Sequence, residues 1–547
     1  MAQIGGDSEV PISKFGPDIF GHFGQSVANA GDLNGDGVND FLVGAPNELS
    51  GGGVGTGVVH AYSGRTGDEI YSIPGSFALE EFGYSVSGIG DLNFDGYDDF
   101  IIGIPGGSLF GQIDHGAAMV VSGIDGSNLY VYTGPLPGSD FGKAVSGVED
   151  MTGDSIPDFV IAAPGVDLGL GGEGAVYLFS GADGSNFHSV GGTYLNERLG
   201  TAVCGVGDLT GDGLVELAIS SPGADPGGLL SAGMVQVFEG GSNALLYQVL
   251  GTEVGFGIGT SLAGLPDFNE DGIPEFAIGA RAAGYNSRVS SGSVFLISGA
   301  DGSVEFRVDG ERDFDEFGTS VSAVGNYFGL AQDMFVVGAP FSDPFGRMDA
   351  GTVYILDGDT GAELRSFIGI LPFDKIGVSL AGLGDMNLDG LDDLAIGSPN
   401  ATGIGVLQGG GVKVYAYNPF LRASTAEFSA SSGALIGFDL EFPLFASIIE
   451  YRILFSGGLG SFQFGTTVPL AMDSHVPSSY FGNYPFSMEL GLQGTLDTNG
   501  RATAVIGVQA GAFTSVIGRT FYLAAIANSP GELPTYSSGA LKMTVLP

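Results

Sequence analysis

The 547-residue sequence has no tryptophan, a single cysteine and few basic residues, with 17 Lys and Arg against 62 Asp and Glu. The formal net charge of −45 excludes nucleic acid and anionic membranes as favourable partners, because few cations are present to neutralise phosphates. The lone cysteine, Cys204, excludes an internal disulfide bond. In the small-residue segment "GTAVCGVGD" we expect its thiol to be buried as a small hydrophobe.

Long hydrophobic runs are also missing. The uncharged run between Arg501 and Arg519 is rich in Gly, Thr, Ser and Gln, so we expect no transmembrane helix and no membrane insertion. The first residues, "MAQIGGDSEV", contain no basic segment followed by an apolar one, so no signal peptide is visible in this chain.

Glycine is abundant at 99 residues, while hydrophobic residues make up 44% of the chain. That hydrophobic share argues against disorder, and the glycines suit many short strands separated by turns.

An acidic loop recurs along the first three quarters of the chain. In the first copy it lies in "GDLNGDGVNDFLVGAP", residues 31–46. The loops begin at Asp32, Asp91, Asp150, Asp208, Asp267 and Asp385. The spacing is 59, 59, 58 and 59 residues and then 118, twice 59, with the skipped place at Asn326. The sequence therefore contains seven copies of one unit, six of which keep the acidic loop.

Each copy opens with an aromatic or aliphatic residue followed by glycine. These pairs are Phe23-Gly24, Phe82-Gly83, Phe141-Gly142, Leu199-Gly200, Ile258-Gly259, Phe317-Gly318 and Ile376-Gly377. Four short segments with period-two patterning follow in each copy, separated by turn residues, and none has helical periodicity. Four-stranded sheets repeated seven times predict a seven-bladed β-propeller in an all-β protein, although a linear stack with capping units is an alternative.

The two ends of the repeat region distinguish a ring from a stack. The seventh copy stops after its third strand, "GVKVYAYNPF", and Gly16 lies seven residues before Phe23, as a glycine does before the later opening pairs. The preceding segment "EVPISKF", residues 9–15, is therefore predicted to supply the fourth strand of blade seven and close the ring.

The Phe-Gly start and the Gly-Ala-Pro finish, at 44–46 and 338–340, resemble FG-GAP repeats. Such repeats build the seven-bladed propeller of integrin α subunits and of many bacterial secreted or surface proteins. The resemblance implies an N-terminal extension at 1–11, a propeller at 12–418 and a separate C-terminal domain at 419–547.

The acidic loop has oxygen-bearing residues at its positions 1, 3, 5 and 9, a backbone carbonyl available at position 7, and in most copies a glycine at position 6. This all-oxygen pattern favours Ca²⁺, and no His or Cys competes as a ligand. The predicted ligands in the first three loops are Asp32, Asn34, Asp36, Val38, Asp40; Asp91, Asn93, Asp95, Tyr97, Asp99; and Asp150, Thr152, Asp154, Ile156, Asp158. In the other three they are Asp208, Thr210, Asp212, Leu214, Glu216; Asp267, Asn269, Asp271, Ile273, Glu275; and Asp385, Asn387, Asp389, Leu391, Asp393.

Up to six Ca²⁺ ions are expected. The third site is the weakest, because Ser155 replaces the glycine, and Glu at position 9 of the fourth and fifth loops is expected to bind differently from Asp. In the sixth copy Asn326, Phe328, Leu330 and Met334 occupy the ligand positions, so this turn should pack on itself and hold no ion. Three carboxylates per loop predict an affinity of about 10⁻⁴ to 10⁻³ M, which suits an extracellular or cell-surface location.

After residue 418 the 59-residue pattern stops. Segments such as "ALIGFDLEF", "SIIEYRILFS" and "TFYLAAIA" alternate in strand fashion, and "TLDTNGRA" contains an Asn-Gly turn typical of a hairpin. A β-sandwich of seven or eight strands is predicted for 419–547.

The sequence offers little support for catalysis, and the protein is expected not to be an enzyme. No G-x-S-x-G is present, and the five histidines, His22, His60, His115, His188 and His475, share no spacing and are expected to be ordinary surface or turn residues. The acid pairs Asp98-Asp99 and Asp392-Asp393 resemble a glycosidase dyad but are better explained as the ends of metal loops.

Three functions stay open. The first is a calcium-stabilised binding or adhesion module that holds a protein or glycan ligand on one propeller face. The second is a structural subunit of a surface layer or fibre that self-assembles through its C-terminal domain or N-terminal strand. The third, less favoured, is a hydrolase with a site in the propeller loops.

Overall fold

The computed structural model describes residues 6–49, 55–108, 114–329, 333–403 and 406–419, and eleven further strands within 421–546, with side chains between 11 and 417. The chain divides into two compact units. The first comprises Val10–Gly325 and Asp333–Tyr415, and the second comprises Met1–Glu9, Asn326–Gln332 and Ala416–Pro547. The three domain boundaries expected from the sequence stay predictions.

Seven four-stranded sheets, the blades, make up the repeat region. Blade one consists of β2 (Ser26–Gly31), β3 (Asp40–Ala45), β4 (Val58–Tyr62) and β5 (Glu69–Pro74). Blade two consists of β6 (Ser85–Gly90), β7 (Asp99–Ile104), β8 (Ala117–Val121) and β9 (Asn128–Thr133). Blade three consists of β10 (Val145–Val148), β11 (Asp158–Ala163), β12 (Ala175–Phe179) and β13 (Asn186–Gly191). Blade four consists of β14 (Val203–Gly205), β15 (Leu217–Ser221), β16 (Met234–Phe238) and β17 (Leu245–Leu250).

Blade five consists of β18 (Ser261–Gly264), β19 (Phe276–Ala280), β20 (Ser293–Ile297) and β21 (Val304–Asp309). Blade six consists of β22 (Ser320–Gly325), β23 (Met334–Ala339), β24 (Thr352–Asp357) and β25 (Glu363–Ile368). Blade seven consists of β26 (Ser379–Gly384), β27 (Asp393–Ser398), β28 (Gly411–Pro419) and β1 (Gly6–Phe15). The helical elements of the described residues are two single 3₁₀ turns, η1 (Pro226–Gly228) and η2 (Pro344–Gly346), and no described helix is long and apolar enough to span a membrane.

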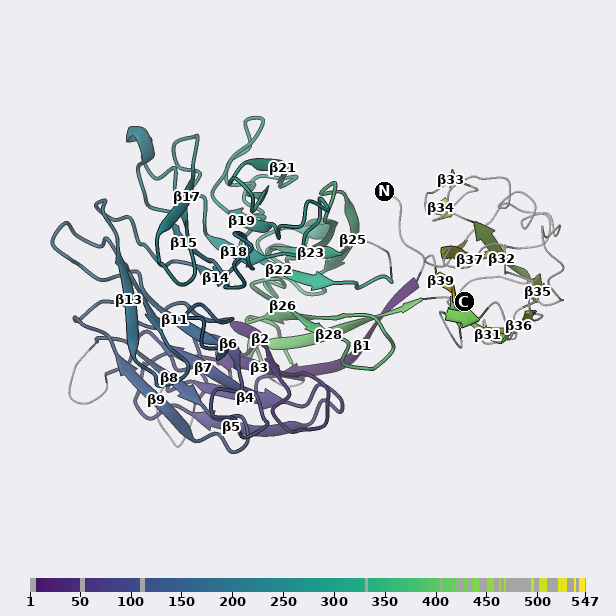
Figure 1. Cartoon of the computed structure of the whole chain (residues 1–547), viewed down its shortest axis with the longest axis horizontal. Helices are drawn as coiled ribbons and strands as arrows, with labels where there is room; N and C mark the ends of the chain where they lie inside the picture. Colours follow the sequence, from purple (N-terminus) through teal and green to yellow (C-terminus); the bar gives the residue numbers. More distant parts are fainter. Residues whose placement is uncertain are drawn as a thin grey trace. The chain divides into compact units, whose positions relative to one another are not determined.

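The N-terminal strand β1 closes the ring. Its sheet has the order β1-β28-β27-β26, so the first strand of the chain occupies the outer edge of the last blade. Figure 1 shows purple β1 beside green β28. The prediction that residues 9–15 supply the missing fourth strand of blade seven is therefore confirmed, and so is the seven-bladed all-β fold.

The position of a strand within its blade explains its composition. The second strand, as in β3, is buried at all six residues, because neighbouring blades cover both of its faces. It accordingly reads as a continuous apolar run, DFLVGA. The fourth strand, as in β5, is partly or fully exposed at every residue and contains both polar and apolar side chains, as suits an outer edge.

The two halves of the FG-GAP motif meet between consecutive blades. A Cβ atom added at Gly44 would lie 2.0 Å from the carbonyl oxygen of Gly83, so only glycine permits this approach. The same carbonyl accepts a hydrogen bond of 2.9 Å from the Ser26 hydroxyl of the preceding blade. The contact also closes the ring, because the Ser379 hydroxyl of blade seven donates to the Gly24 carbonyl of blade one at 2.9 Å.

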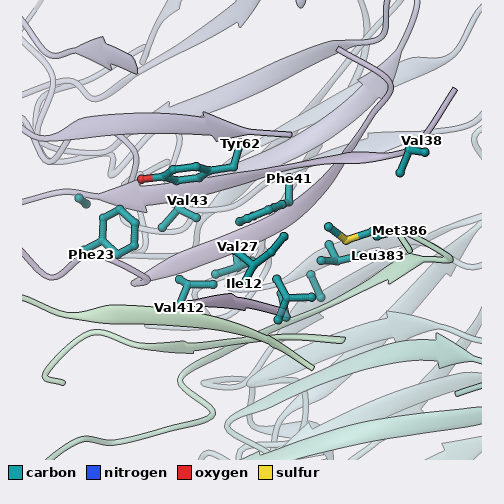
Figure 2. Packing of buried hydrophobic residues seen from close by; sticks show 14 residues of the cluster. Ile12, Phe23, Val27, Val38, Phe41, Val43, Tyr62, Leu383, Met386 and Val412 are labelled. Atoms are coloured by element: carbon teal, nitrogen blue, oxygen red, sulfur yellow. The ribbon is translucent and has the colours of Figure 1, made fainter. Parts of the chain in front are cut away.

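Apolar side chains fill the spaces between blades. The opening residue Phe23 is 1% exposed and belongs to a buried cluster that includes Val412 of β28 and Phe41 of β3. Ile12 of β1 is 7% exposed and belongs to the same cluster. Figure 2 shows these side chains converging between the purple ribbons of blade one and the green ribbons of blade seven. The core of the ring is therefore a series of inter-blade layers.

Beyond the propeller, the described strands form further sheets. They are β29 (Leu421–Ala423), β30 (Glu427–Ser429), β31 (Ala434–Glu441), β32 (Glu450–Ser456), β33 (Phe462–Gln463), β34 (Thr467–Val468), β35 (Gln493–Thr495), β36 (Arg501–Val508), β37 (Thr520–Asn528), β38 (Tyr536–Ser537) and β39 (Leu541–Leu546). One sheet has the order β29-β31-β36, a second the order β30-β39-β37-β32-β35 with β38 on β37, and β33 pairs with β34.

The expected Asn-Gly hairpin is wrong as a strand pairing. β35 pairs with β32 and β36 pairs with β31, so the strands that flank the turn belong to different sheets. The reason is length: β36 gains eight paired residues along β31, more than the short β35 offers. That the sheets pack face to face as a sandwich stays a prediction.

Ring closure through β1 predicts that Ile12→Ala destabilises the propeller by about 2–5 kcal/mol, because it removes a buried side chain from the layer between blades one and seven. Chemical denaturation of the full chain measures this. The exposed neighbour Ser13 provides the control, and Ser13→Ala should change stability by less than about 0.5 kcal/mol. Equal effects of the two substitutions would contradict a packed closing strand.

Candidate metal centres in the acidic loops

Each acidic loop connects the first and second strands of a blade and wraps around the carboxylate at position 1. In the first loop, Asp32 Oδ1 accepts the Gly35 N–H at 2.7 Å, and Oδ2 accepts the Gly37 N–H at 2.8 Å. In the seventh loop, Asp385 Oδ2 accepts the Gly390 N–H at 2.7 Å. This local wrapping is the form that Asx side chains impose on tight turns, and it brings the later positions back towards the first.

Positions 3 and 5 stabilise the same turn. Asn34 Oδ1 accepts the Asp36 N–H at 3.0 Å, and Asp36 Oδ1 accepts the Val38 N–H at 3.0 Å. The position-5 bond recurs in all six loops, with Tyr97, Ile156, Leu214, Ile273 and Leu391 as the donors. The position-7 residues therefore contribute N–H groups to the loop, and the role of their carbonyl oxygens as metal ligands stays a prediction.

The third loop departs from the others at position 6. Ser155 adopts a φ of 67°, in the left-handed region that costs a residue with a Cβ more than it costs glycine. Its N–H nevertheless donates to Asp150 Oδ2 at 2.6 Å, so the loop keeps the common wrapping.

The acid at position 9 begins the second strand, or in the fourth and fifth loops directly precedes it, and is buried. Asp40, Asp99, Asp158, Glu216 and Glu275 are 0% exposed and Asp393 is 1% exposed. Asp40 Oδ2 accepts the Leu33 N–H at 2.9 Å, and Oδ1 accepts the N–H of Gly64, in the turn between β4 and β5, at 3.0 Å. This second contact was not predicted from the sequence, where its signal is a glycine about 24 residues after the acid; Gly123 and Gly181 repeat it.

Burial raises the pKa of these acids. Desolvation is the largest cause, and it raises the pKa of Asp40 to about 7 although two backbone N–H groups lower it, while the nearby charges of Asp36 and Asp32 raise it further. The pKa of Glu275 is likewise raised to about 7, first by burial, and also by Glu305 and Asp267. A cation bound among these groups would offset the repulsion that raises both values.

In two loops the three carboxylates converge. Oxygen atoms of Asp208, Asp212 and Glu216 all lie within 4.8 Å of one another, and so do those of Asp267, Asp271 and Glu275. Within the described residues these are the two groups of three potential ligands that meet this limit. The two groups converge because a glutamate side chain is one methylene longer than an aspartate, so its carboxylate extends further into the loop.

The seventh loop contains a buried oxygen that lacks a partner. Asp393 Oδ2 accepts the Met386 N–H at 3.0 Å, whereas Oδ1 is buried and accepts no hydrogen bond from the residues that the structure describes. Blade seven has no turn after its third strand, because β1 supplies the fourth, so no turn glycine donates to this acid. Buried polar atoms are rarely left unsatisfied, and a divalent cation would fit this oxygen.

The sixth copy has apolar side chains in place of the ligands, as expected. Tyr327 and Phe328 are 0% and 2% exposed. Their rings lie 5.0 Å apart, and the Phe328 ring lies 4.9 Å from that of Tyr417. Met334 begins β23 and is 1% exposed, while Leu330 lies outside the described residues. Whether this turn holds no ion stays a prediction.

Among the histidines, the expectation of an ordinary surface or turn position is wrong for His60. This side chain is 7% exposed, with Nε2 3.2 Å from Glu48 Oε2 and Nδ1 3.2 Å from Glu69 Oε1. Burial lowers the pKa of His60, but the two carboxylates more than offset this, and the net shift is upward. The partners come from a loop and from β5, so spacing along the chain offered no sign of them. His475 lies outside the described residues.

A family model described as the FG-GAP repeat matches the chain at residues 23–62, 82–117, 141–179, 199–238 and 258–297. Each match begins at an opening pair and extends into the third strand of the same blade. The sixth and seventh copies, found from the spacing of the sequence, lie outside these matches.

Several curated proteins are similar to the chain. Integrin alpha-V of Gallus gallus is 29% identical over 236 residues, covering 40% of this chain and 22% of its own length. Integrin alpha-5 of Xenopus laevis is 34% identical over 170 residues, or 28% of this chain and 16% of its own length. Phosphatidylinositol-glycan-specific phospholipase D of Homo sapiens is 28% identical over 396 residues, covering 63% and 46%. The chain thus spans less than half the length of these relatives.

The phospholipase relatives contradict the expectation that the protein is not an enzyme. The human protein and those of Mus musculus, Bos taurus and Rattus norvegicus carry the name of an enzyme and match about 60% of this chain. The expectation rested on the lack of known catalytic motifs in the sequence. Such a lack does not exclude an enzyme, because catalytic residues are set by a site and not by the fold that carries it.

The seven four-stranded sheets, the five matched repeats and the integrin α relatives together show that this chain contains FG-GAP repeats in a seven-bladed β-propeller and is similar to integrin α subunits.

Proposed function

We propose that this protein is an extracellular binding or adhesion module whose propeller is stabilised by Ca²⁺ in up to six acidic loops. The observation that supports the cation sites most strongly is the buried Oδ1 atom of Asp393, which has no hydrogen-bond partner among the described residues. The all-oxygen donor sets, with no nitrogen or sulfur ligand at the loop positions, favour Ca²⁺ over transition metals. The expected millimolar or submillimolar affinity suits extracellular calcium, and a bacterial origin and surface location stay part of this proposal.

The loop tips indicate which propeller face binds a ligand. Because strands alternate in direction, the loop after a second strand and the junction to the next blade lie on one face, and the Asn47 N–H donates to Gly21 O between them at 3.1 Å. Among the residues with described side chains, 29 large hydrophobic ones are exposed, of which 21 lie in such loops and three in loops of the opposite face. Exposed apolar groups gathered on one face typically mark an interaction surface.

Four of these tips are also strained. Phe20, Leu79, Phe314 and Phe373 lie three residues before the opening pair and adopt φ angles of 60°, 62°, 64° and 68°. The same position is Gly138, Asn196 and Gly255 in the junctions leading to blades three to five. Bulky residues in this region of φ are uncommon, and such strain concentrates at functional sites. The four tips precede blades six, seven, one and two, which are consecutive, so they favour a protein or glycan ligand on this arc.

A second candidate function is an enzyme or the binding part of one. The observation that favours it is the match to proteins named phosphatidylinositol-glycan-specific phospholipase D over about 60% of the chain. Assay of the full chain for cleavage of a phosphatidylinositol-glycan anchor, with and without calcium, distinguishes this candidate from a module that only binds. Self-assembly into a layer or fibre stays a further prediction, for which sedimentation of the full chain in calcium is the test.

Calcium should raise the melting temperature of the full chain, because cations neutralise carboxylates that otherwise repel one another. The rise should follow the concentration of Ca²⁺ over about 10⁻⁴ to 10⁻³ M and be smaller with Mg²⁺, which tolerates irregular oxygen sites poorly. Differential scanning calorimetry after chelation and re-addition measures both. An unchanged melting temperature at millimolar Ca²⁺ would rule out calcium stabilisation.

Without calcium, the Asp40→Asn and Asp393→Asn variants should differ in melting temperature. Both oxygens of Asp40 accept backbone N–H groups. The amide of Asn would place its own N–H group against one of these donors, which should lower the free energy of unfolding by about 1–3 kcal/mol. One oxygen of Asp393 is free, so Asp393→Asn should melt within a few degrees of the wild type in chelator but gain less from added calcium. Equal melting of the two variants under both conditions would argue against a cation at the seventh loop.

Replacing the four strained tips by asparagine should abolish ligand binding without lowering the melting temperature. The substitutions are Phe20→Asn, Leu79→Asn, Phe314→Asn and Phe373→Asn, because the fourth copy already has Asn196 at this position. The matched control introduces asparagine at Leu245, Leu250 and Val304, which are exposed on the outer strands β17 and β21. Biolayer interferometry against immobilised extracellular matrix proteins and glycans in calcium is the measurement. Binding that survives the tip variant, or is lost in the control, would contradict the proposed face.

A further inference from the structure

A cavity of about 220 Å³ lies between blades six and seven. Its walls are largely apolar and include Ile368 of β25, Ile376, Ile396 of β27 and Phe15 of β1. Lys413 of β28 and Asp374 are the charged residues that line it. All of these residues belong to one compact unit. The cavity lies apart from the acidic loops, which are at the other ends of the strands, so its role is independent of the calcium sites.

Comparison with the neighbouring blade shows how the cavity arises. The equivalent space between blades five and six is smaller, about 160 Å³, and is lined by Phe317 and Tyr354, whose ring centroids lie 5.4 Å apart. Ile376 and Lys413 occupy the corresponding positions at blade seven. An aliphatic side chain and a lysine thus replace two packed rings, and the space between the sheets is larger.

Lys413 is the distinctive group in this cavity. Its side chain is on the third strand of blade seven, where the other blades have His60, Met119, Tyr177, Gln236, Phe295 and Tyr354. Lys413 is half-buried and forms no ion pair within 4.0 Å among the described residues. An ammonium group that is partly withdrawn from water and has no carboxylate oxygen within 4.0 Å can be stabilised by a bound anion.

The carboxylate of Asp374 is already engaged by the backbone. Asp374 is 8% exposed, and its Oδ2 accepts the Leu371 N–H at 3.0 Å. Burial raises its pKa, while backbone hydrogen bonds from Leu371, Ile370 and Thr402 and the charge of Lys413 lower it. Asp374 thus holds the junction loop in shape, and Lys413 is left as the group able to bind a ligand.

We propose that this cavity is a binding site for a small monocarboxylate with an apolar body. The carboxylate pairs with the Lys413 ammonium, and the body packs against Ile376 and Ile396. An apolar cavity of about 150 Å³ holds benzene, so about 220 Å³ admits a phenyl ring with a short acidic tail, such as phenylacetate, or a short aliphatic acid. This site is separate from the face proposed above for a protein or glycan ligand.

Isothermal titration calorimetry on the full chain in calcium, with phenylacetate and straight-chain carboxylates from butyrate to octanoate as probes, tests the proposal. Phenylacetate should bind at least tenfold more tightly than phenylacetamide, its neutral analogue, because the amide cannot pair with Lys413. Saturation by none of these carboxylates at about 10 mM would overturn the proposal.

Two variants with precedents in sister blades complete the test. Lys413→Met introduces the residue that blade two has at this position and should weaken phenylacetate binding at least tenfold. Ile376→Phe restores the opening residue of blade six and should weaken phenylacetate binding at least tenfold by occupying part of the cavity, without lowering the melting temperature. Unchanged affinity in either variant, measured where its melting temperature matches that of the wild type, would overturn the assignment.

Discussion

The close contact between consecutive blades at the two glycines of the motif is the constraint on which the rest of the structure depends. The Gly83 carbonyl lies so near Gly44 that a Cβ there would clash, and the Ser26 hydroxyl donates to that carbonyl. The contact recurs in blades one, two, five, six and seven, where it ends with Ser379 on Gly24, whereas blades three and four have Ala162 and Ser220 in place of the glycine. Because each blade packs against its two neighbours, local contacts of this kind build the ring.

The acidic loops are attached to this ring through the acid at position 9. In blade one that acid binds both its own loop and the turn after the third strand, so loop conformation and sheet packing are linked. Loops of neighbouring blades are also connected, since Asp98 Oδ2 accepts the Asp32 N–H at 2.7 Å across the blade boundary. A cation bound at one loop would therefore stabilise the adjoining blade as well as its own.

Blade seven differs from the others because the N-terminal strand completes it. Its third strand is not followed by a turn, which deprives Asp393 of the glycine N–H that Asp40 receives from Gly64. The same closure places Phe15 at the edge of the cavity that contains Lys413. Two groups able to bind a ligand thus occur in the blade where the repeat is interrupted. They are the Asp393 oxygen, which has no partner among the described residues, and Lys413 in its apolar cavity.

The sequence by itself determined the seven repeats, the four strands of each blade, the closure by residues 9–15 and the positions of the acidic loops. These follow from spacing, side-chain alternation and turn chemistry, all of which are local. Only the tertiary structure decided that the carboxylates converge where Glu216 and Glu275 replace aspartate, that His60 is buried between two glutamates, and that β35 and β36 join different sheets. Those outcomes depend on contacts between segments distant in the sequence, whose approach is fixed by packing and not by any local pattern.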